Sequence, residues 1–110
     1  MIVIFKSDAA GDVIMFGDVA HRLMKIMGKD VTAKGIVTVE QLPDAIARLE
    51  AAIAEDKARF ASVAEEERPV SEVGARGELR PFVTLTQRAV PLLELLQWSL
   101  KKKKPMTWGV

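Results

Sequence analysis

The chain has 110 residues, of which 49% are hydrophobic and 28% are charged, and its formal net charge is +1. This length suits one domain, because chains of this size bury roughly 60–70% of their unfolded surface. The small net charge favours neither nucleic acid nor a membrane surface as a partner. Cysteine is absent, which excludes disulfides, thiolate catalysis and cysteine metal sites. We therefore expect a single domain over residues 1–110.

The chain opens with a short apolar run that is rich in β-branched residues. Met1–Phe5 is typical of a buried strand, and it is far too short for the apolar segment of a signal peptide. The apolar stretch that follows is interrupted by charges, so it does not have the composition of a membrane span. We expect a cytoplasmic bacterial protein.

A first helix is predicted over Asp12–Met27. Its apolar residues fall on an arc that covers roughly half of the helix circumference, wider than the roughly 100° stripe of an ordinary surface helix. Ser7 or Asp8 is expected to cap its first turn, and Gly28 is a natural left-handed stop. Because so wide an arc has to be covered on more than one side, we expect part of it to form an interface with another protein.

A second helix follows a capping box, in which Thr38 and Gln41 satisfy each other's backbone N–H groups. Pro43 either kinks this helix or lies near its first position. Apolar residues then recur at three- and four-residue steps, and Pro69 ends the helix by about Arg68.

The segment Glu65–Pro81 is polar and contains glycine and proline, and we expect it to be a mobile loop. The pattern Thr84–Gln87 repeats the capping box and predicts a third helix. Pro91 is expected to kink or split that helix. After a run of lysines, Met106–Val110 is apolar and has the composition of a strand.

These elements predict an α+β fold, with about three helices packed on one face of a small sheet. The N-terminal and C-terminal strands are expected to pair with each other in this sheet. Two strands alone are marginally stable, so we expect a third strand within Val31–Val37.

Several segments together resemble one family. They are Ile4–Ser7, Met27–Lys29, Gly35–Pro43, Gln87–Leu93 and Thr107–Val110. In these segments the chain is similar to short proteobacterial proteins classified as a domain of unknown function, number 1840. The resemblance covers the whole chain and implies a single-domain bacterial protein. It implies no reaction, ligand or catalytic residue.

One candidate site lies on the polar side of the first predicted helix. His21 is the only histidine, and Asp18 and Lys25 lie three residues before it and four after it, on the same helical face. Asp18 and His21 could act as an acid–base pair or bind a ligand, with Lys25 as a further polar partner. Two ligands are too few for a zinc site, so no metal is predicted. The structural alternative is a histidine at the edge of the core, hydrogen-bonded to Asp18.

A second candidate is the lysine run at the end of the third predicted helix. Its members are Lys101, Lys102, Lys103 and Lys104. They could bind phosphate groups of nucleic acid or anionic lipid. They also complement the helix dipole, and a solvated helix end is the structural alternative.

The sequence contains no phosphate-binding glycine loop, nucleophile elbow or pair of carboxylates at catalytic spacing. We therefore expect a non-catalytic interaction or regulatory protein without a cofactor, with a homodimer as one form. The alternatives are a small-molecule or metal binder at Asp18, His21 and Lys25, and electrostatic binding of nucleic acid or membrane through Lys101–Lys104.

Overall fold

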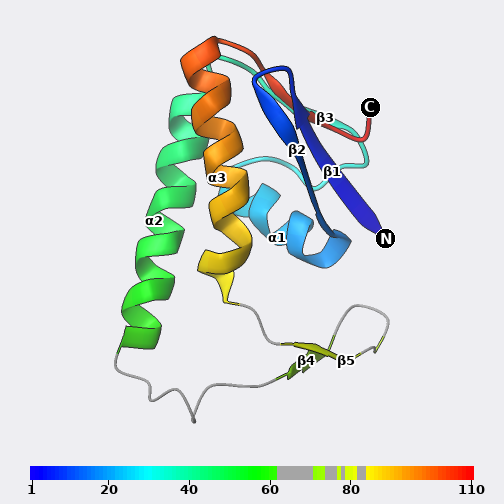
Figure 1. The fold of residues 1–110 in the computed structure, drawn as a ribbon, viewed down its shortest axis with the longest axis vertical. Helices are drawn as coiled ribbons and strands as arrows, with labels where there is room; N and C mark the ends of the chain where they lie inside the picture. Colours follow the sequence, from blue (N-terminus) through cyan, green and yellow to red (C-terminus); the bar gives the residue numbers. More distant parts are fainter. Residues whose placement is uncertain (62–70, 74–76, 78, 82–83) are drawn as a thin grey trace.

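The computed structural model describes residues 1–61, 71–73, 77, 79–81 and 84–110. Three helices, a four-stranded sheet and a separate two-stranded hairpin make up this described part (Figure 1). In chain order the elements are β1 (Ile2–Ser7), β2 (Ala10–Phe16), α1 (Gly17–Ile26), β3 (Gly35–Val37), α2 (Leu42–Ala61), β4 (Ser71–Val73), β5 (Leu79–Pro81), α3 (Leu85–Lys102) and β6 (Met106–Trp108).

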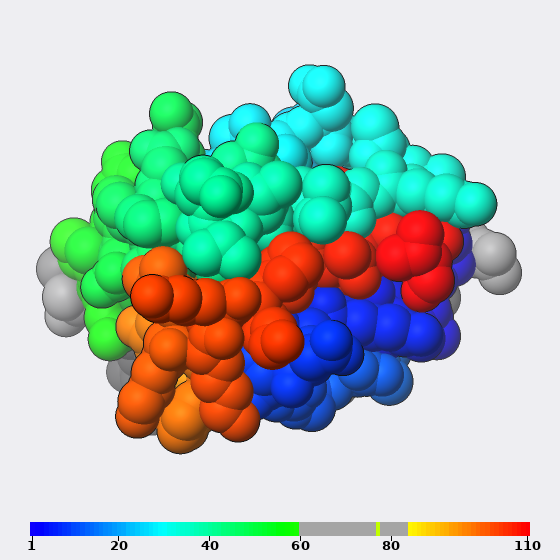
Figure 2. Space-filling view, turned by 90° about the horizontal axis from the view of Figure 1, so that it is seen from above, coloured from blue at the N-terminus to red at the C-terminus, as the bar shows by residue number. Residues whose placement is uncertain are grey.

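The main sheet has the strand order β2-β1-β6-β3, and all its strand pairs are antiparallel. The N-terminal and C-terminal strands pair as predicted, with Phe5 opposite Trp108. The predicted third strand is also present, since Gly35 lies opposite Trp108 on the other side of β6. A space-filling view from above shows β6 in red between the blue hairpin and the cyan-green segment that contains β3 (Figure 2). The α+β prediction is confirmed.

The predicted first helix is wrong in its first part, because residues 10–16 form β2. Four consecutive apolar residues, Val13–Phe16, fit a strand as well as a helix. In the structure Val13 and Met15 are half-buried while Ile14 and Phe16 are exposed, which is the two-residue period of a strand. Pairing with β1 supplies the backbone hydrogen bonds of this segment. The helix begins only at Gly17.

Ser7 and Asp8 therefore do not cap a helix. They belong to the tight β1–β2 turn, where the Ser7 hydroxyl oxygen accepts a hydrogen bond from the Ala9 N–H at 3.2 Å. The predicted stop at Gly28 is confirmed. Its φ is 82°, and the N–H groups of Gly28 and Lys29 donate to carbonyls in the last turn of α1.

The third helix begins as predicted, because Thr84 and Gln87 form a complete capping box at α3. At Thr38 the arrangement differs from the predicted box: the Gln41 side chain accepts the Thr38 N–H at 3.1 Å, but the Gln41 N–H donates to the Thr38 carbonyl at 3.0 Å. The helix α2 begins only at Leu42, and Pro43 is its second residue. Pro91 does not split α3, which is continuous from Leu85 to Lys102.

The segment expected to be a mobile loop, 65–81, contains β4 and β5, which pair antiparallel. These two strands were not predicted from the sequence. Apart from Gly77, the remaining residues of the segment lie outside the described residues, as does the end of the second predicted helix at 62–68. The mobility of the segment stays a prediction.

The helices cover one face of the main sheet and form the core with it (Figure 1). Phe5 and Trp108 lie at its centre, with their rings edge to face at 5.9 Å between centroids. Met24 of α1 and Met27, which directly follows this helix, are both buried in the core. The opposite face of the sheet is left uncovered by the described helices.

Candidate interaction site

The uncovered face of the main sheet carries large apolar side chains, and we call it the outer face. Alternation along the strands places Ile2 and Ile4 of β1 there, opposite Phe16 and Ile14 of β2. The exposed fractions are 61% for Ile2, 63% for Ile14 and 46% for Phe16. Ile36 of β3 lies on the same face and is 43% exposed. Because polar side chains normally occupy the solvent side of such a sheet, this apolar face is the candidate interaction site.

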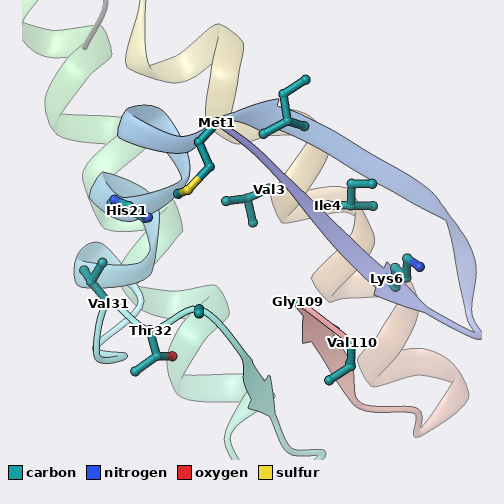
Figure 3. A pocket seen from close by; sticks show the side chains of 11 residues that line it. Met1, Val3, Ile4, Lys6, His21, Val31, Thr32, Gly109 and Val110 are labelled. Atoms are coloured by element: carbon teal, nitrogen blue, oxygen red, sulfur yellow. The ribbon is translucent and has the colours of Figure 1, made fainter. Parts of the chain in front are cut away.

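A notch of about 530 Å³ lies beside the outer face, where β6 ends between β1 and the segment that precedes β3 (Figure 3). Its described lining residues are Met1, Ile2, Val3, Ile4, Lys6, His21, Val31, Thr32, Ala33, Gly109 and Val110. The lining is mainly aliphatic. Among these described residues, Lys6 is the one lysine, and no side chain is acidic.

The wall opposite β1 is held by contacts with β6. The Trp108 indole Nε1 donates to the Thr32 carbonyl at 3.0 Å, and the Thr32 hydroxyl donates to the Lys34 carbonyl at 2.7 Å. Gly109 has a φ of 74°, and a Cβ at this position would overlap the Ala33 carbonyl. Glycine therefore allows both the turn after β6 and its close approach to this wall.

All three members of the first candidate site lie in α1. His21 is half-buried and lies at the notch, with Met1 and Val31 nearby (Figure 3). Asp18 and Lys25 are exposed and are not among the described lining residues. The Asp18, His21 and Lys25 site stays a prediction, and only His21 is placed at a cavity.

Among the described residues, no group of three or more histidine and acidic side chains is placed to hold a metal ion. The same residues include no helix with the length and hydropathy needed to cross a membrane.

A comparison with known protein families gives a match that covers nearly the whole chain. The family model described as Domain of unknown function (DUF1840) matches residues 1–108. The chain belongs to this family. No curated protein and no solved structure gave a match. The family assignment confirms the resemblance found in the sequence, and it assigns no reaction to the notch or the outer face.

The second candidate site, the lysine run, closes α3 in this member of DUF1840. All four lysines are exposed, but Lys102 Nζ donates to the Ala9 carbonyl at 2.9 Å and so contacts the β1–β2 turn. The ammonium groups of Lys101 and Lys102 also lie 5.0 and 5.5 Å from the centre of the Trp98 ring. These contacts agree with the structural alternative of a helix end, and anion binding stays a prediction.

An interface was predicted from the sequence, but it was assigned to an over-wide apolar arc of the first helix. That reason is wrong, because the arc combined residues of β2 with residues of α1. The exposed apolar residues lie on the sheet instead. The feature that could have identified them is the apolar run Met1–Phe5, which has no polar residue on either face of the strand.

Proposed function

We propose that this protein is a non-catalytic interaction protein of the bacterial cytoplasm, and that its outer face binds a second copy of the chain. The observation that carries the proposal is the group of exposed apolar side chains on one sheet face, Ile2, Ile14, Phe16 and Ile36. Burial of apolar surface is the main driving force of most protein association.

The size of this surface supports a dimer. With roughly 200 Å² for each large side chain, the exposed fractions of these four residues amount to on the order of 400 Å² of apolar surface. Patches of roughly 300–600 Å² on monomers are often functional. A standard interface buries about 800 Å² per partner, of which somewhat more than half is apolar. The outer face thus supplies most of the apolar area that one partner needs.

The chemistry of the surface supports a second copy as the partner. A twofold interface places the same patch on both subunits, so that the patch has to complement itself. Four neighbouring side chains of this face are aliphatic or aromatic, and exposed Lys6 and Asp12 flank them on the same strands. Two such apolar blocks can pack about 10 Å apart. Ile2, Ile4, Ile14 and Phe16 form an uninterrupted block of this kind across β1 and β2.

Sedimentation velocity between about 1 and 200 µM would test the proposal. We expect a dimer for the unaltered chain and a monomer for Ile14→Glu, since Ile14 is 63% exposed and its replacement leaves the core intact. Leu100→Glu is the matched control, because Leu100 is an exposed apolar residue of α3. It should remain a dimer. A monomer at every concentration for the unaltered chain would refute the proposal.

A further inference from the structure

We propose that the notch is a second binding site, which accepts an extended peptide segment with aliphatic side chains and an acidic residue. The segment would add to the free edge of β1 in line with β6. This inference goes beyond the proposed dimer, because it concerns the backbone edge of β1 and a different class of partner. The notch adjoins the outer face and shares Ile2 and Ile4 with it.

The backbone of β1 supplies the first argument. The Gly17 N–H donates to the Met1 carbonyl at 2.9 Å, so the backbone groups of Met1 are directed toward β2. Backbone groups alternate sides along a strand, and those of Ile2 and Ile4 therefore point away from β2, toward the notch. On that side, β6 pairs with β1 only at Phe5 and Lys6. The first residues of β1 thus form an open strand edge, which is a template for a further strand.

The width of the notch supplies the second argument. β6 lies between β1 and β3, and each strand spacing is about 4.8 Å, so β1 and β3 are roughly 10 Å apart. The space beyond the end of β6 therefore has the width of one extended strand. Its far wall is already held in place by the Trp108–Thr32 and Thr32–Lys34 hydrogen bonds. A preformed wall reduces the entropy lost on binding.

The lining supplies the third argument and selects the partner. Aliphatic residues of β1, Val31 and Val110 favour aliphatic side chains. Lys6 provides a positive charge, and His21 and Thr32 provide hydrogen-bonding groups. No described lining side chain is acidic, so the Lys6 ammonium group attracts an acidic group on the peptide. A small apolar anion would use Lys6 but would leave the β1 edge unpaired.

Fluorescence anisotropy with the labelled peptide acetyl-Ile-Thr-Val-Asp-Ile-amide would test this site in the full chain. We expect saturable binding below about 1 mM. N-methylation of the central valine should weaken it about tenfold, because one backbone donor is removed. Lys6→Glu should weaken it about fivefold, while Lys57→Glu, an exposed lysine of α2, should leave it unchanged. Backbone amide signals of Ile2 and Ile4 should shift on titration.

The inference would be overturned by the absence of binding at 1 mM, by equal binding of the N-methylated peptide, or by equal binding by the Lys6→Glu variant. Loss of binding in Ile14→Glu would also overturn it, because the peptide would then use the outer face. The oligomeric state of that same variant separately reports on the proposed dimer, so failure of either idea can be recognised alone.

Discussion

Replacement of a buried aspartate in α2 should destabilise the fold more than replacement of an exposed aspartate, because the buried side chain makes tertiary hydrogen bonds. Asp56 is 4% exposed, and its Oδ2 accepts from the N–H of Thr86 at 3.0 Å and from the Thr86 hydroxyl at 2.8 Å. Thr86 is the second residue of α3, so its N–H is one of the four that have no partner within the helix. Asp56 thus fixes the start of α3 against α2 across 30 residues of sequence.

The expected loss of stability follows from these contacts. Hydrogen bonds to a charged group contribute about 1.5–3 kcal/mol each, and removal of one partner leaves the other unsatisfied. The two bonds share one oxygen and one donor residue, so their effects are not additive. The carboxylate also complements the α3 dipole by about 0.3–1 kcal/mol. We therefore expect Asp56→Ala to lower the free energy of unfolding by about 3 kcal/mol, and the melting temperature by roughly 10 °C.

Asp44→Ala is the matched control on the same helix. Asp44 pairs with Arg48 at 2.7 Å, but the two side chains are 68% and 55% exposed. Such surface pairs contribute about 0.2–1 kcal/mol. Urea unfolding followed by circular dichroism at 222 nm would compare the two variants. Losses that differ by less than about 1 kcal/mol would refute the tertiary role given to Asp56.

Three further changes test other parts of the fold by the same unfolding measurement. Gly35→Ala should destabilise by about 2 kcal/mol or more, because a Cβ would overlap the buried Trp108 ring; an unchanged midpoint would contradict this. Thr84→Ala should cost about 1 kcal/mol through loss of the capping box at α3. Lys103→Gly should instead stabilise by about 1 kcal/mol, because Lys103 has a φ of 56°. A destabilised Lys103→Gly variant would show that the lysine side chain outweighs this backbone strain.

Local chemistry was sufficient to predict several elements from the sequence. The Thr84–Gln87 capping box and the left-handed Gly28 depend on side chains and backbone within one helical turn, and both are present. The strand composition of Met1–Phe5 and Met106–Val110 was also sufficient for the prediction that the two ends pair. Proline at position 43 lies in the first turn of α2, as its missing N–H favours.

The sequence was ambiguous where one apolar run fitted both the periodicity of a helix and that of a strand. Val13–Phe16 fits a helix or a strand, and pairing with β1 decides for the strand. The tight turn that makes this pairing possible is held by Ser7 and by contact between Lys102 and Ala9, which are 93 residues apart. No local pattern contains that contact.

The candidate sites show the same division between local pattern and tertiary structure. The sequence alone determined that His21 is the one histidine, and that an interaction protein was a better expectation than an enzyme. Only the tertiary structure placed His21 at the notch and left Asp18 and Lys25 outside it. Likewise, only strand pairing brings Ile2, Ile14 and Phe16 onto one face, with Ile36 from β3 beside them. Helical spacing is fixed by the backbone, whereas strand neighbours are fixed by the register between segments far apart in sequence.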